Sequence, residues 1–185
     1  RHKITNLMSR ISEWSNFAEE NLNLELFKEL LKPPSFLENP IKKIIKLNFK
    51  DLSLHNKPIA IAEDNAFHFR YPEMKELFEH LNMPINIWSP LKNEPIPQDI
   101  TGIILPGGFP EEYAEELSQA KESIESINSH FGKTPIYAEC GGMILLGESL
   151  VDINRRKFSM SGLLPFSARE GKLQVGYRNI KGIEN

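Results

Sequence analysis

Four short apolar runs, separated by segments of helical character, follow Pro58 along the sequence. A strand that is buried on both faces reads as a continuous apolar run, and neighbouring parallel strands need helical crossovers. We therefore predict an α/β fold with a mostly parallel sheet and helices on both faces. The expected strands are 59–62, 85–88, 102–105 and 135–138, followed by 159–164 and 172–177. The expected helices start at Pro72 and Pro110, surround Ile127, and span 141–148.

Residues 1–56 have a different pattern. Apolar residues from Ile4 to Ile11 recur at helical spacing, and Asn23 is a suitable cap for a second helix that ends before Pro33. No strand pattern accompanies these helices. We interpret residues 1–56 as the helical tail of a preceding domain with its linker, and residues 57–185 as the sheet domain, truncated at its C-terminus.

A lone cysteine, Cys140, stands between an expected strand and an expected helix. Small residues flank it at Ala138 and Gly142, two positions before and after. This is the cysteine form of a nucleophile elbow, a tight turn that presents the side chain to a cleft. A lone cysteine is more often a buried structural residue, but this context favours a nucleophile. The backbone N–H of Gly141 is then a candidate donor to an oxyanion.

A second loop, Pro106 with Gly107 and Gly108, ends the preceding strand. Two glycines allow the backbone to approach a ligand closely. The loop has no Gly-Lys-Ser/Thr ending, so it does not indicate nucleotide binding. Ligands in parallel sheets bind at the carboxyl ends of strands. We therefore expect this loop to form the second wall of an oxyanion hole.

Four stretches of the sequence resemble the cobyrinate a,c-diamide synthase family. They are 64–73, 105–111, 138–143, and 162–165 together with 176–178, so that the resemblance covers about residues 58–180. In that family a class I glutamine amidotransferase domain of flavodoxin-like fold follows an ATP-dependent synthetase domain. The nickel-sirohydrochlorin a,c-diamide synthases are close relatives, and this part of the sequence does not separate the two.

The resemblance implies a mechanism and a set of partners. Cys140 attacks the side-chain amide of glutamine and releases ammonia, while the backbones of Gly108 and Gly141 hold the oxyanion. Ammonia passes to the synthetase domain, where ATP and Mg²⁺ activate the a- and c-acetate carboxylates of a corrinoid. This chain itself would need no cofactor, and on its own it should amidate nothing.

The roles of several other residues stay open at this point. The catalytic histidine of the family is expected beyond residue 185, and His68 is expected to have a packed or surface role. Glu139, Asp64 and Tyr71 are candidates to line the cleft, although Asp64 is also ordinary turn chemistry.

Composition excludes several classes of protein. Net charge is −3 with mixed signs, which gives no nucleic-acid footprint, and no apolar run approaches the roughly 20 residues of a membrane span. One cysteine makes neither an internal disulfide nor a zinc site, so a cytoplasmic setting is expected. A homodimer is compatible with the sequence. Two other functions stay open: a cysteine hydrolase of the intracellular-peptidase type, which usually has histidine where Gly141 stands, and a non-catalytic docking domain.

Overall fold

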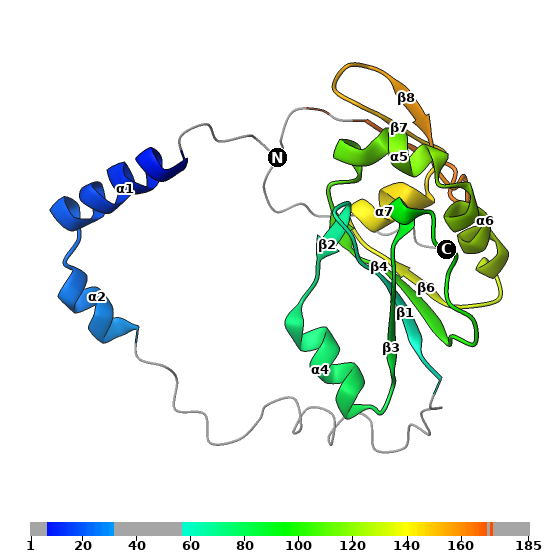
Figure 1. Ribbon diagram of the computed structural model, residues 1–185, viewed down its shortest axis with the longest axis horizontal. Helices are drawn as coiled ribbons and strands as arrows, with labels where there is room; N and C mark the ends of the chain where they lie inside the picture. Colours follow the sequence, from blue (N-terminus) through cyan, green and yellow to red (C-terminus); the bar gives the residue numbers. More distant parts are fainter. Residues whose placement is uncertain (1–6, 32–56, 170, 172–185) are drawn as a thin grey trace, which may run out of the picture.

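A four-stranded parallel sheet forms the centre of the computed structural model, which describes residues 7–31, 57–169 and 171 (Figure 1). Its strands lie in the order β3-β1-β4-β6, and every neighbouring pair is parallel. This confirms the predicted α/β class. The strands are β1 (Ile59–Ala62), β3 (Ile85–Trp88), β4 (Gly102–Leu105) and β6 (Ile136–Ala138).

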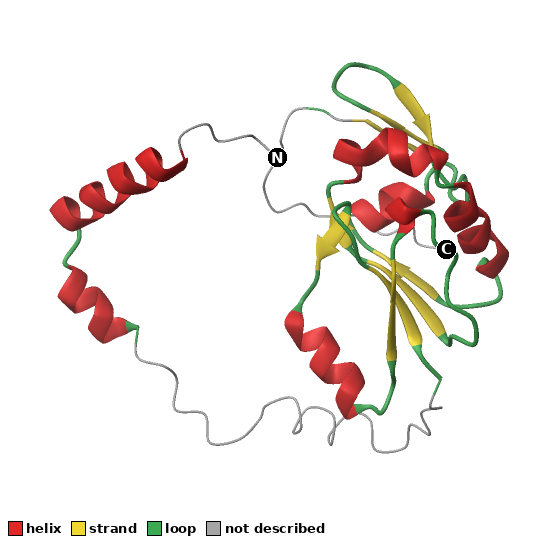
Figure 2. Cartoon of the chain, viewed as in Figure 1, coloured by secondary structure: helices red, strands yellow, loops and turns green. Residues whose placement is uncertain are grey.

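Helices cover both faces of this sheet, as predicted (Figure 2). The larger core contains Ala60 and Leu105 from the sheet, together with Leu117 and Leu145 from the helices on that side. On the other face α4 packs Met74 and Phe78 against a smaller apolar cluster. The helices of the domain are α4 (Pro72–His80), α5 (Ala114–Gln119), α6 (Lys121–His130) and α7 (Gly141–Leu146), with 3-10 turns η1 (Pro90–Lys92) and η2 (Pro110–Tyr113).

Two small sheets were not predicted. Strands β2 (Phe67–Phe69) and β5 (Gly107–Gly108) form an antiparallel pair. Strands β7 (Ser149–Val151), β8 (Lys157–Ser159) and β9 (Ser167–Arg169) form a three-stranded sheet in the order β8-β7-β9.

The predicted strand at 159–164 is wrong beyond Ser159. The N–H groups of Ser161 and Leu164 donate to carbonyls at the end of α7, Leu145 O at 3.0 Å and Leu146 O at 2.8 Å. The segment therefore caps the C-terminus of that helix rather than pairing with a strand. For the same reason α7 ends at Leu146, two residues before the predicted end. The strand predicted at 172–177 lies outside the described residues.

Both N-terminal helices are present as α1 (Leu7–Asn21) and α2 (Leu24–Leu30). Asn23 caps the second one, accepting a hydrogen bond from Leu26 N at 3.0 Å. Neither helix buries a residue, and Figure 1 shows them apart from the sheet domain. Their assignment to a preceding domain stays a prediction.

The turn between β7 and β8 provides a pH-dependent prediction. Burial acts to raise the pKa of Asp152, but hydrogen bonds from Arg156 N and Nε, both 2.8 Å, outweigh it, and the pKa lies below its usual value. A lowered folded-state pKa stabilises the fold above the unfolded-state pKa, and this is lost as pH falls through the folded value. We expect Asp152→Asn to lower the Tm at about pH 7 and the difference from wild type to shrink as pH falls below the ordinary aspartate pKa of about 3.9. A Tm difference that is constant across this range would contradict the prediction.

Candidate active site

Cys140 lies in the sharp turn between β6 and α7. Its backbone has φ 46° and ψ −114°, a positive φ that a non-glycine residue rarely adopts, and its side chain is exposed. Such strain persists only where the surrounding structure imposes it, and it is concentrated at functional sites. The strand-cysteine-helix turn expected from the sequence is therefore present.

Gly142, two residues after Cys140, lets α7 pack directly on β4. A Cβ added at Gly142 would lie 2.0 Å from Leu105 O and 2.5 Å from Leu105 C. These are backbone atoms that cannot rotate away. Only glycine fits here, and this close approach sets the position of the elbow above the end of β4.

Gly141 brings the elbow against the Pro-Gly-Gly loop. A Cβ added at Gly141 would lie 3.1 Å from Gly108 N and 3.2 Å from Gly108 O. A Cβ added at Gly107 would lie 3.4 Å from the Cβ of Cys140. The two loops, more than 30 residues apart in the sequence, therefore meet at the carboxyl ends of β4 and β6.

The pairing of β2 with β5 holds the backbone of the glycine loop in place. Gly108 is directly opposite Phe67, and Phe109 N donates to Ala66 O at 3.0 Å. The pairing is irregular, with a register shift between Phe67 and Phe69. Gly108 N lies close to the elbow, 3.1 Å from the position that a Cβ on Gly141 would take.

A cavity of about 520 Å³ opens at the cysteine. Its described walls come from β2 and the residues after it, from β5, and from the elbow. The lining residues are His68, Phe69, Arg70, Tyr71, Gly107, Glu139 and Cys140. A thiol, a cation and a carboxylate thus share one cavity large enough for an amino acid.

Two of the three residues proposed to line the cleft do so. Tyr71 and Glu139 both line this cavity. The Tyr137 hydroxyl donates to Glu139 Oε2 at 3.0 Å, and this hydrogen bond, with the charge of the carboxylate, raises the pKa of Tyr137. Their roles stay predictions.

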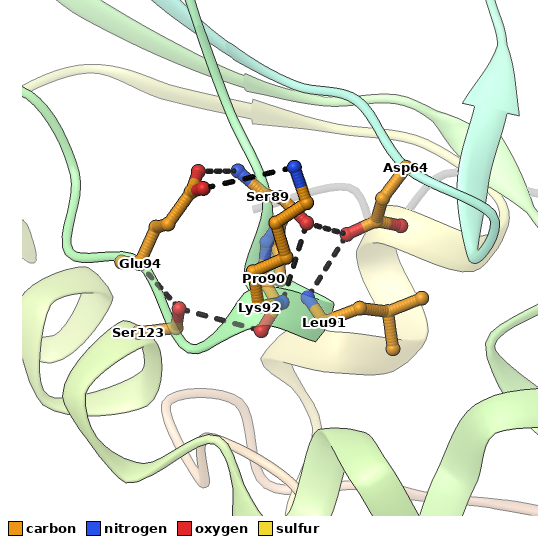
Figure 3. Close-up of polar contacts among 7 residues, drawn as sticks. All are labelled: Asp64, Ser89, Pro90, Leu91, Lys92, Glu94 and Ser123. Atoms are coloured by element: carbon orange, nitrogen blue, oxygen red, sulfur yellow. Dashed lines mark hydrogen bonds and ion pairs between the residues drawn. The ribbon is translucent and has the colours of Figure 1, made fainter.

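The third residue, Asp64, is not among the described residues that line the cavity. Its carboxylate accepts hydrogen bonds from Ala66 N at 2.8 Å and Phe67 N at 3.1 Å, and from Ser89 Oγ at 3.0 Å and Leu91 N at 2.9 Å (Figure 3). The first two make the Asx turn that its sequence context also indicated. Asp64 thus faces the segment after β3 instead of the cleft.

Sequence reasoning missed part of the cavity wall, the segment from His68 to Arg70. His68 is exposed, as expected, and its Nδ1 lies 3.0 Å from Asn65 O. Its ring contacts Phe69 and Phe109, with centroids 4.7 Å and 5.7 Å away. The available signal was the position of this stretch just past the carboxyl end of the first strand, where ligands bind.

Neither a metal site nor a membrane span is found in the described part of the chain. No group of three or more His, Cys, Asp or Glu side chains there could hold a metal ion. Among residues 7–31, 57–169 and 171, no helix is long and apolar enough to cross a bilayer.

A parallel sheet with a cysteine elbow facing a glycine loop at the strand ends defines a class I glutamine amidotransferase fold. Residues 58–182 match the CobB/CobQ-like glutamine amidotransferase domain, and the chain belongs to this family. This confirms the resemblance seen in the sequence motifs.

Curated relatives named cobyrinate a,c-diamide synthase are similar over most of the chain. The protein of Priestia megaterium is 36% identical over 169 residues, which cover 89% of this chain and 35% of that protein. The protein of Synechocystis sp. is 30% identical over 193 residues, covering 99% of this chain and 38% of the relative. The chain therefore spans little more than a third of the length of these relatives.

Proposed function

We propose that this chain is the glutaminase part of an ATP-dependent amidoligase. It hydrolyses glutamine and supplies ammonia for amidation of the a- and c-side-chain carboxylates of cobyrinate in cobalamin biosynthesis. The observation that carries the proposal is the strained, exposed Cys140 packed against the Gly107–Gly108 loop at one cavity. The family match and the names of the relatives support the choice of substrate.

The glutaminase reaction follows from this arrangement. The Cys140 thiolate attacks the side-chain carboxamide carbon of glutamine, forming a C–S bond and a tetrahedral oxyanion. The N–H groups of Gly108 and Gly141 stabilise the negative oxygen. The intermediate expels ammonia after nitrogen takes up a proton, which leaves a glutamyl thioester. Water then hydrolyses the thioester to glutamate and restores the thiol. We expect the base to be a histidine beyond residue 185.

The ligase half of the reaction is assigned to the remainder of a longer protein. The loop at Gly107 and Gly108 lacks the lysine of a phosphate-binding loop, and the described residues include no metal-ligating cluster. We place ATP and Mg²⁺, with the corrinoid, in a preceding synthetase domain. Residues 1–56 would be its helical tail, and residues 57–185 the glutaminase domain.

The substrate is tested with the full-length protein, ATP, Mg²⁺ and glutamine. Cobyrinate and nickel-sirohydrochlorin are supplied separately, and the products are identified by mass spectrometry. We expect cobyrinate to gain two carboxamides at the expense of two carboxylates. Amidation of nickel-sirohydrochlorin alone would reassign the substrate. Peptide hydrolysis with glutamine inert would instead support a cysteine hydrolase of the intracellular-peptidase type.

A further inference from the structure

The Asp64 carboxylate joins two segments that are distant in the sequence. Oδ1 accepts from Ala66 N and Phe67 N within its own turn, whereas Oδ2 accepts from Ser89 Oγ and Leu91 N after β3 (Figure 3). All four groups that contact it are donors. An ionised carboxylate accepts at both oxygens, whereas an asparagine side chain has one oxygen and would turn an NH₂ group toward two of these donors.

The segment after β3 is itself firmly held. Ser89 is 4% exposed, and its N–H donates to Glu94 Oε2 at 2.7 Å. Ser123 of α6 is 1% exposed, and its hydroxyl donates to the backbone carbonyl of Glu94. Through these bonds, also visible in Figure 3, η1 is attached to the helical layer. Asp64 therefore anchors its turn to a rigid support.

Ala66 connects the Asp64 turn to the glycine loop. Its N–H donates to Asp64 Oδ1 at 2.8 Å, and its carbonyl accepts from Phe109 N at 3.0 Å. A Cβ added at Gly108 would lie 1.9 Å from the same carbonyl oxygen. Ala66 is fully buried, so we expect a shift of the Asp64 turn to move Gly108 with it.

We propose that Asp64 is a positioning residue for the oxyanion hole. Its carboxylate fixes the turn from which β2 holds the Gly108 N–H beside Gly141. Asp64 is not among the described residues that line the cavity, so it acts on the reaction through Ala66 and Phe67 of its turn, which contact the Gly108 loop. This inference rests on the proposed glutaminase function and assigns it a residue outside the cavity.

The test uses Asp64→Asn in the full-length enzyme. We expect kcat for glutamine hydrolysis to fall roughly tenfold or more with little change in KM, because donor placement matters most when the oxyanion forms. The glutamine γ-aldehyde, which adds to the Cys140 thiol as a tetrahedral adduct, should bind correspondingly more weakly. Glutamine itself should bind Cys140→Ser and the Cys140→Ser/Asp64→Asn double variant equally.

Asp152→Asn is the matched control. Like Asp64, Asp152 ties a turn through its carboxylate, here with two 2.8 Å hydrogen bonds. Asp152 is buried and lies in the β7–β8 turn. We expect it to lower the Tm and leave affinity for the aldehyde unchanged. Equal aldehyde affinity in Asp64→Asn and wild type would overturn the inference, as would equally weakened binding of glutamine and aldehyde.

Two further arms keep the result decisive. If Asp64→Asn does not fold, Ser89→Ala removes one donor to Oδ2 and should shift aldehyde affinity in the same direction; an unchanged affinity there would overturn the inference. If wild type neither hydrolyses glutamine nor binds the aldehyde, the proposed function fails. If wild type hydrolyses glutamine and binds the aldehyde, and Asp64→Asn and Ser89→Ala do so equally well, only the role of Asp64 is contradicted.

Discussion

Cys140→Ser in the full-length protein is expected to reduce glutamine hydrolysis by about 10³-fold or more, since a hydroxyl is a far weaker nucleophile than a thiolate. Cys140 is exposed, and its strained backbone is set by its neighbours rather than by its own sulfur. Serine is close in size, so the fold should persist. Amidation supported by added ammonium salts should also persist, because that reaction bypasses the glutaminase site. Initial rates with glutamine and with ammonium give the comparison.

The ammonium rate is the internal control for this variant, together with an unchanged Tm. Loss of both activities would indicate damage to the ligase half rather than removal of a nucleophile. Glutamine-dependent amidation at the wild-type rate would show that Cys140 is not the nucleophile.

Gly142→Ala is expected to have the largest effect on stability. The new Cβ would overlap the backbone of Leu105, with Leu105 O 2.0 Å away and Leu105 C 2.5 Å away. Relief requires α7 to move off β4, which opens the larger core at Leu145. We expect a loss of roughly 3 kcal/mol or more, as for severe overpacking. That corresponds to a fall in Tm of roughly 10 °C or more, measured by thermal unfolding.

Gly102→Ala, at the first residue of β4, provides the comparison. Its Cβ would lie 3.8 Å from Pro135 O and 4.0 Å from Ile59 Cγ1, which are ordinary contacts. We expect its Tm to stay close to that of wild type. Similar losses in the two variants would show that the effect comes from glycine replacement in general and not from the packing of α7 on β4.

Local sequence patterns predicted the central sheet well. The bounds of β1, β3 and β4 match their expected ranges. A short continuous apolar run bounded by proline or polar residues is typical of a strand that is buried on both faces. Strands β2 and β5 were missed because their pairing is non-local and one of them consists of two glycines. The apolar residues Leu163 and Leu164 suggested a strand, but they pack against the larger core from a loop.

The candidate site likewise combines features set by local sequence, which were predictable, with features set by non-local contacts, which were not. Cys140 and the glycines around it were identifiable because an elbow is a local turn with strict size requirements. The role of Asp64 was not, because Ser89 and Leu91 lie 25 and 27 positions away and reach it only through the fold. The stretch from His68 to Arg70 likewise becomes a cavity wall only when β2 pairs with β5.

The central claim, that Cys140 is a glutamine-specific nucleophile, is tested most directly by labelling the full-length protein with an electrophilic glutamine analogue such as a diazo-ketone. Intact-mass and peptide mass spectrometry locate the adduct, and a general thiol reagent is run in parallel. We expect one adduct, on Cys140, whose formation is blocked by excess glutamine. An unlabelled Cys140 that still reacts with the general thiol reagent would contradict the claim, because it would show a reactive cysteine without a glutamine site.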